Sequence, residues 1–108
     1  MRKFAIIGMS SFGFYLTKFL SERNFNVMAV DNDEGIIEKI KPFTYKAIIA
    51  DARDKETLEN LGISDFDVVV VSLGGQIDAS ILVTLYLKEL NVKEIIAKAV
   101  TEDHGKIL

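Results

Sequence analysis

A short stretch near the N-terminus, Gly8-Met9-Ser10-Ser11-Phe12-Gly13, has the spacing of a phosphate-binding turn whose middle glycine is replaced by serine. In such a turn the first glycine permits the reversal, the second lets a pyrophosphate approach the backbone, and the third lets the next helix pack closely. Gly8 and Gly13 retain two of these functions. The N–H groups and partial positive charge of a helix start also favour an anion. Ser10 occupies space beside such an anion yet offers a hydroxyl donor, and a simple helix cap remains an equal interpretation.

Two aspartates stand where later apolar runs end. Asp31 follows residues 27–30 and comes eighteen positions after Gly13. A carboxylate there accepts hydrogen bonds from ribose hydroxyls and repels a 2′-phosphate, which disfavours NADP. The alternative is a solvated acid that caps the following helix. Asp51 follows residues 47–50 and is placed to reach the base end of a nucleotide, although it is also a candidate helix cap beside Asp54.

The elements that must position these residues alternate along the chain. Five apolar runs rich in Val, Ile and Ala occupy residues 4–7, 27–30, 47–50, 68–71 and 95–97, and they read as strands covered on both faces. Segments with helical spacing of apolar residues separate them. Because parallel strands need right-handed crossovers, this alternation predicts an α/β fold, a Rossmann-like doubly wound parallel sheet with strand order 3-2-1-4-5. Ligands of such sheets bind at the carboxyl ends of the strands, where residues 72–75 also converge.

Composition bounds the remaining possibilities. The chain has 108 residues, which suits one domain, and a formal charge of -3 with its basic residues scattered, so nucleic-acid binding has no electrostatic support. It has no cysteine, and therefore no disulfide or thiolate metal site, and a reducing, cytoplasmic setting is the default expectation. No apolar run approaches the ~20 residues of a membrane span, and we expect neither a span nor a signal peptide.

Two further patterns concern the second half of the chain. Apolar residues surround most of the circumference of the helix expected after residue 76, whereas a helix that covers one sheet face keeps a polar side. A second buried face, and hence assembly of the chain with a partner, is expected; the alternative is that loops or a neighbouring helix cover this face. Residues 101–108 have the pattern of a helix start with Thr101 as its cap, so we expect the domain to be cut within its last helix; the alternative is a short tail that docks on the domain.

Taken together, these residues resemble the N-terminal nucleotide-binding domain of the RCK/KTN family, the TrkA-type regulators of potassium channels and transporters. The resemblance covers residues 3–108, nearly the whole chain. It is carried by the first strand with Gly8 and Phe12-Gly13, by the second strand with Asp31, and by Ala50-Asp51-Ala52-Arg53. It continues through residues 69–74 and Asp78-Ala79-Ser80, and closes at Lys98-Ala99.

The resemblance implies a non-enzymatic, cytoplasmic gating module peripheral to the inner membrane face, which binds NAD(H) or an adenine nucleotide (ATP, ADP or AMP). It implies phosphates on the turn at residues 8–13, ribose on Asp31, and adenine near Asp51 and Ala52. It also implies a homodimer or larger ring, a membrane potassium channel or transporter subunit as partner, and a sixth strand further on. The expected ligand-binding residues are Gly8, Met9, Ser10, Ser11, Phe12, Gly13, Asp31, Asn32, Asp51, Ala52, Leu73, Gly74 and Lys98.

Two departures and two rival functions qualify that expectation. Family members generally carry glycine at the position of Ser10 and often a basic residue at that of Ser11, so triphosphate recognition is in question. One rival is an NAD-binding fragment of an oxidoreductase, although the single histidine, His104, lies in the incomplete last helix. The other is a phospho-receiver domain centred on Asp51, which lacks the acidic pair that such domains need after the first strand to hold magnesium.

Overall fold

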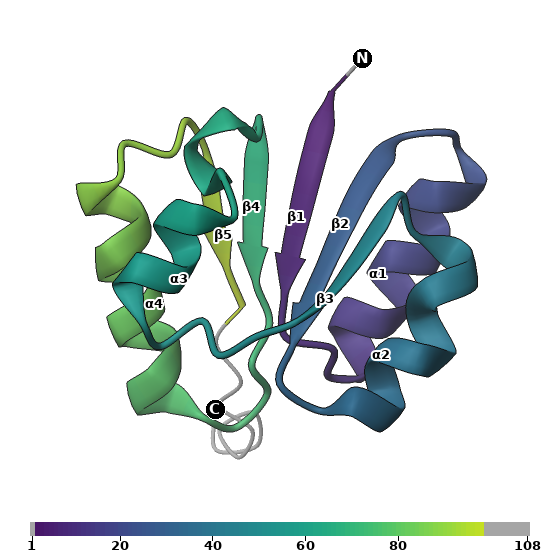
Figure 1. The fold of residues 1–108 in the computed structure, drawn as a ribbon, viewed down its shortest axis with the longest axis horizontal. Coiled ribbons are helices and arrows are strands. Elements are labelled where there is room, and N and C mark those ends of the chain that lie inside the picture. Colours follow the sequence, from purple (N-terminus) through teal and green to yellow (C-terminus); the bar gives the residue numbers. More distant parts are fainter. Residues whose placement is uncertain (1, 99–108) are drawn as a thin grey trace, which may run out of the picture.

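A single parallel sheet organises residues 2–98, the part of the chain that the computed structural model describes. Its strands are β1 (Lys3–Ile7), β2 (Asn26–Asp31), β3 (Lys46–Ile49), β4 (Val68–Val71) and β5 (Ile95–Ala97). They pair in the order β3-β2-β1-β4-β5, and every pairing is parallel (Figure 1). The fold class and strand order predicted from the alternating pattern are therefore confirmed.

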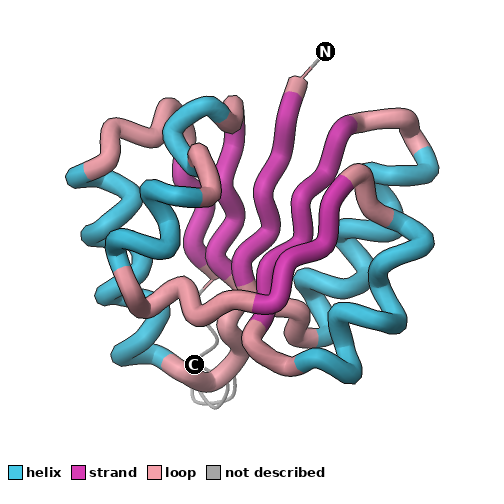
Figure 2. The backbone as a smooth tube through the Cα atoms, in the orientation of Figure 1, coloured by secondary structure: helices cyan, strands magenta, loops and turns pink. Residues whose placement is uncertain are grey.

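Helices cover both faces of this sheet. One face carries α1 (Ser11–Glu22), α2 (Glu34–Ile40) and a 3-10 turn, η1 (Lys41–Phe43); the other carries α3 (Lys55–Asn60), a second such turn, η2 (Ile63–Asp65), and α4 (Ile77–Glu89) (Figures 1 and 2). The helix starts follow local chemistry, because Ser10, Asp33 and Asp54 each accept a backbone N–H of the first turn. After α1 and α4 the chain turns through Asn24 and Asn91, both in the left-handed conformation that asparagine tolerates.

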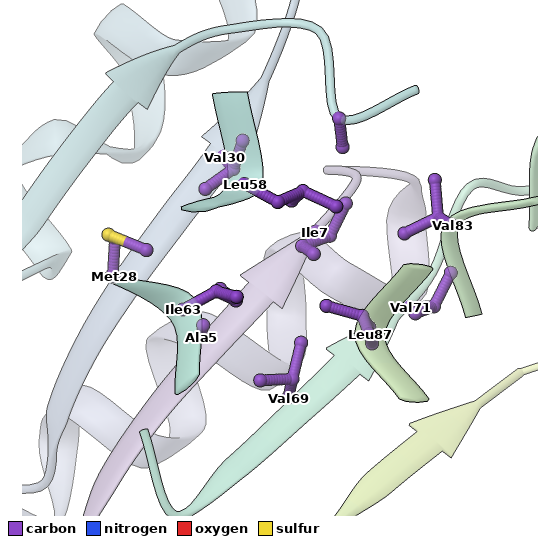
Figure 3. Close-up of a cluster of buried hydrophobic side chains, with 11 residues drawn as sticks. Ala5, Ile7, Met28, Val30, Leu58, Ile63, Val69, Val71, Val83 and Leu87 are labelled. Carbon is purple, nitrogen blue, oxygen red and sulfur yellow. The ribbon is translucent and has the colours of Figure 1, made fainter. Parts of the chain in front are cut away.

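The core lies in two layers because successive side chains of a strand point to opposite faces. Ala5 and Ile7 of β1 face α3 and α4, where they join Leu58, Val83 and other buried side chains (Figure 3). On the opposite face, β1 and β2 pack against the buried side chains of α1 and α2. Burial on both faces explains why β4 is an unbroken run of four valines.

All five strands end at the same edge of the sheet, at the foot of Figure 1, and the turns that follow them meet there. Our expectations for Thr101, His104 and the last helix concern residues outside the described part of the chain. None of the helices within residues 2–98 combines the length and the apolar character needed to cross a membrane.

Candidate functional site

The turn between β1 and α1 is built around Gly8, whose φ of +99° side chains rarely permit. A Cβ at this position would lie 2.4 Å from the carbonyl oxygen of Ser72, at the end of the neighbouring strand β4. The Gly8 N–H donates to the Val30 carbonyl oxygen at 2.8 Å, which ties the turn to β2 as well. The turn therefore lies between the ends of three strands, where only a residue without a Cβ fits at position 8.

Gly13 brings the first turn of α1 against this loop. A Cβ added there would lie 2.1 Å from the Gly8 carbonyl oxygen and 2.4 Å from the Ser72 hydroxyl oxygen. The Ser72 side chain is buried and donates its hydroxyl hydrogen bond to that same Gly8 carbonyl. Gly13 thus serves helix packing, and it lines none of the three pockets described below for residues 2–98.

The start of α1 leaves backbone donors pointing to the strand ends. The first N–H groups of a helix have no partner within the helix. Ser10 accepts one of them, from Gly13 at a donor–acceptor distance of 3.4 Å, so the expected capping role of Ser10 is present. The N–H groups of Ser11 and Phe12 donate to no other described residue. These two groups, with the helix dipole, form the anion-attracting part of the site.

Asp31 joins two of the turns. Its Oδ2 accepts the Met9 N–H at 2.7 Å, and its Oδ1 accepts the Asp33 N–H at 2.8 Å. The Met9 N–H, counted in the phosphate turn by its sequence position, is therefore directed at this carboxylate, and the Met9 side chain is buried. Helix α2 is capped by Asp33 rather than by Asp31. Because each carboxylate oxygen has two lone pairs, Asp31 retains acceptor capacity for ribose hydroxyls.

Asp51 is held by its neighbour Arg53 in a two-pronged ion pair. Arg53 donates from Nε to Oδ1 at 3.0 Å and from a terminal guanidinium nitrogen to Oδ2 at 2.9 Å, while its backbone N–H donates to Oδ1 at 3.0 Å. These bonds lower the pKa of the Asp51 carboxyl and raise the pKa of the Arg53 guanidinium. The cap of α3 is Asp54, so Asp51 is available for another role.

Three pockets that share lining residues run along the strand ends. A tight pocket of about 50 Å³ lies beside Asp31 and Asp51, one of about 200 Å³ beside Met9, and one of about 360 Å³ beside Ser11. The sequence-predicted residues found on their walls are Gly8, Met9, Ser10, Ser11, Phe12, Asp31, Asn32, Asp51, Ala52, Leu73, Gly74 and Lys98. Turns far apart in the sequence therefore form one continuous surface.

Lys98 brings a positive charge to the largest of these pockets. Its ammonium group lies 5.3 Å from the ring centroid of Phe12, and its backbone N–H donates to the Val71 carbonyl oxygen at 2.9 Å. Among the residues that line the three pockets within the described chain, Lys98 is the one lysine or arginine. It lines the same pocket as Ser11, so this pocket holds a cation although Ser11 itself has none.

Sequence reasoning missed Gln76, which lines both the 50 Å³ and the 200 Å³ pockets. It immediately precedes α4, in the turn after β4 that also contains Gly74 and Gly75. Its position near a strand's carboxyl end was the available signal. The amide of Gln76 can both donate and accept hydrogen bonds. Ser72 was noted at the same edge, but its burial and its bond to the Gly8 carbonyl give it a structural role.

A separate apolar groove lies along α4. Ile77, Ile81 and Leu85 are 41%, 56% and 52% exposed, and they line a groove of about 250 Å³ that ends at Ala97 and Lys98. The opposite side of the helix is buried through Val83 and Leu87, among others. Over residues 2–98, the second apolar face predicted for this helix is therefore present and uncovered.

The sequence is similar to a known domain family and to potassium uptake proteins. The sequence model of the TrkA-N domain family matches residues 4–108. Ktr system potassium uptake protein C of Bacillus subtilis (strain 168) is 44% identical over 107 residues, which are 99% of this chain and 48% of that protein. The chain spans about half the length of the curated relatives it matches.

The fold is shared with solved structures of other proteins. The Shewanella denitrificans Kef CTD in its AMP-bound form superposes with a TM-score of 0.76 at 20% identity, over 95% of this chain and 62% of that one. The NAD(P)-binding domain of an exopolyphosphatase-related protein from Archaeoglobus fulgidus has a TM-score of 0.75 at 17% identity, over 99% and 94% of the two chains. At these identities the likeness concerns the fold alone.

Proposed function

The chain belongs to the TrkA-N domain family, and from that premise we propose that it is a regulatory nucleotide-binding domain of a potassium uptake or channel system. The observation that carries the proposal is the meeting of helix N–H groups without a partner in residues 2–98, a lysine and two carboxylates along one continuous set of pockets. Hydrogen-bond donors and a positive charge lie at one end of these pockets, and the carboxylate acceptors lie at the other. This arrangement suits a ligand with a phosphate at one end and hydroxyl and amino groups at the other. The relatives named for potassium uptake supply the setting.

The proposed ligand is NAD(H) or an adenine nucleotide, with its phosphate at the N–H groups of Ser11 and Phe12 and near Lys98. Ser10 and Gly74 border that space, and a Cβ at Gly74 would lie 3.7 Å from the Ser10 Cβ. A cation and two amides fit a phosphate chemically. One cation matches a short phosphate chain better than a triphosphate.

The ribose and base occupy the other end in this proposal. Asp31 accepts the ribose hydroxyls, with Asn32 beside it, and its charge disfavours the 2′-phosphate of NADP. Asp51 and Ala52 border the adenine, and Leu73 forms the wall of the same pocket. The AMP named with the Kef structure and the NAD(P) named with the exopolyphosphatase-related structure are compatible ligand classes.

We further propose that the domain acts by assembly and not by catalysis. Two copies, or a larger ring, pair through apolar surface that includes the α4 groove, and the ring docks on the cytoplasmic side of a membrane potassium channel or transporter subunit. Ligand occupancy then changes gating only if the ligand contacts one arrangement of the paired domains better than the other.

Calorimetric titration of the chain with NADH, NAD, ATP, ADP and AMP tests the binding proposal. We expect at least one adenylate to bind, and Lys98→Gln to weaken it several-fold, because a charge-assisted contact to phosphate is lost. Lys88→Gln, which removes a lysine from the α4 groove, is the matched control and should leave affinity unchanged. Absence of binding by every adenylate would refute the proposal.

One alternative has support from the fold, which is shared with an NAD(P)-binding domain: the chain as the NAD-binding part of an oxidoreductase. Incubation of the full chain with NADH and a panel of small carbonyl compounds separates the two. The regulatory proposal expects no oxidation of NADH above the background rate. Turnover with any of these compounds would favour the oxidoreductase.

A further inference from the structure

The ion pair between Asp51 and Arg53 lies on a backbone that cannot easily move. Ala52, between the two residues, is 7% exposed and belongs to the core cluster beneath α3 and α4. Asp51 and Arg53 flank this anchored residue, and their charged side chains contact each other at the rim of the pocket. Because they are only two positions apart, closing this contact orders very little chain.

The pair determines which hydrogen bonds Asp51 can make. Arg53 engages both carboxylate oxygens, and its planar fork holds the carboxylate in one orientation. Asp51 lines the 50 Å³ pocket together with a second carboxylate, Asp31, and Arg53 supplies the adjoining positive charge. An ionised carboxylate accepts hydrogen bonds and donates none.

We propose that Arg53 is a positioning residue for base selection: it holds Asp51 as a fixed acceptor, so that a purine with an exocyclic amino group is preferred over its oxo analogue. This inference rests on the adenine nucleotide site proposed above and adds to it the residue that positions Asp51 and so sets how strongly the amino group is preferred. An amino group donates to Asp51, whereas an oxo group in the same place faces the carboxylate with a second acceptor. The oxo analogue binds more weakly because its oxygen is left without a hydrogen-bond donor and is repelled by the carboxylate. The size of the contact between base and protein is the same for both purines.

The stability of the domain should not depend on this pair. The side chains of Arg53 and Asp51 are 54% and 47% exposed, and exposed ion pairs contribute little to stability. Substitution of Arg53 should therefore leave the fold intact while changing what Asp51 accepts. A purely structural role would give the opposite result, with altered stability and unchanged base preference.

The test is the ratio of the dissociation constants of IMP and AMP, measured by calorimetry on the full chain. The two nucleotides share their phosphate and ribose, so any general effect of charge cancels in the ratio. We expect the unmodified chain to prefer AMP by roughly tenfold, the scale of one hydrogen bond to a charged group. Arg53→Met should reduce the preference to about threefold or less, and Arg53→Lys, which keeps the charge without the fork, should give an intermediate value.

Two further variants complete the design. Lys55→Met removes a nearby exposed cation that pairs with Glu89 instead of Asp51, so it should retain the full AMP preference. Asp51→Asn supplies an amide that can donate as well as accept, and it should bring the ratio close to one.

The possible failures are distinguishable. Equal binding of AMP and IMP by the unmodified chain, or an unchanged ratio in Arg53→Met, would overturn the inference while leaving nucleotide binding intact. Tighter AMP binding with a higher ratio in Arg53→Met would also overturn it, because Arg53 would then be blocking Asp51. Binding of neither nucleotide would overturn the proposed function, and this inference with it.

Discussion

Replacing Asp31 with alanine should destabilise the domain as well as weaken the ligand. The carboxylate accepts the Met9 N–H at 2.7 Å and the Asp33 N–H at 2.8 Å, so it clamps the β1–α1 turn to the β2–α2 turn. A hydrogen bond to a charged group contributes about 1.5–3 kcal/mol, and its loss costs most where water cannot replace it. The Met9 bond is partly buried, whereas the Asp33 bond is exposed.

We therefore expect Asp31→Ala to lower the free energy of unfolding by roughly 2–4 kcal/mol, most of it from Met9. For a domain of this size that corresponds to a fall in melting temperature of about 10–25 °C. Asp31→Asn keeps one carbonyl acceptor and should lose roughly half as much. Urea denaturation followed by circular dichroism measures these differences.

Asp65→Ala is the control, because Asp65 is exposed and η2, the 3-10 turn that contains it, has no side-chain cap hydrogen bond. It should stay within about 0.5 kcal/mol of the unmodified chain. If Asp31→Ala also stayed within that range, the clamp would be refuted. If Asp31→Ala were destabilised but still bound adenylates with unchanged affinity, the ribose assignment would be wrong and the clamp would stand.

Gly13→Ala should lower the free energy of unfolding by about 1–3 kcal/mol in the same denaturation assay, because its Cβ would lie 2.1 Å from the Gly8 carbonyl oxygen; unchanged stability would contradict the close packing. The hydrogen bond from the Lys3 N–H is the largest of the effects that lower the pKa of the Asp67 carboxyl. The ionised carboxylate therefore stabilises the fold at pH values above its ordinary pKa of 3.8, and this stabilisation is lost as the pH falls through the lowered pKa. Acid titration of stability should therefore be shallower in Asp67→Asn over that window, and coincident curves would argue against the effect. Ile81→Asp should shift the chain towards monomer in light scattering at little cost to folding, since Ile81 is 56% exposed; an unchanged mass would exclude this part of the α4 groove from the interface.

Much of the fold could be predicted because its determinants are local. The predicted and observed ends of the five strands differ by no more than one residue. For example, β3 ends at Ile49, one residue earlier than predicted, and β2 extends one residue further, to Asp31. Parallel strands covered on both faces need continuous apolar runs, and the handedness of crossovers leaves few strand orders to choose from. The capping role of Ser10 also followed from its residue type and place.

The partners of the polar side chains could not be predicted in the same way. Sequence position predicted a ribose contact for Asp31, but it did not predict the contact with the Met9 N–H, which belongs to a turn 22 positions away. Lys98 reaches the pocket beside Phe12 only because β5 lies next to β4, and it brings a positive charge to a pocket that Ser11 also lines. Gln76 attracted no prediction: its place after the carboxyl end of a strand was a signal, but only the assembled sheet shows that it lines pockets with Gly8 and Asp31.

The order of elements, the turn at Gly8 and the apolar character of the α4 surface were determined by the sequence itself, because periodicity and backbone conformation act over a few neighbouring residues. Tertiary structure alone decided which donors and acceptors face one another at the strand ends. Hydrogen bonds and ion pairs depend on distances of about 3 Å between groups remote in the chain. Those distances exist only once the sheet has assembled.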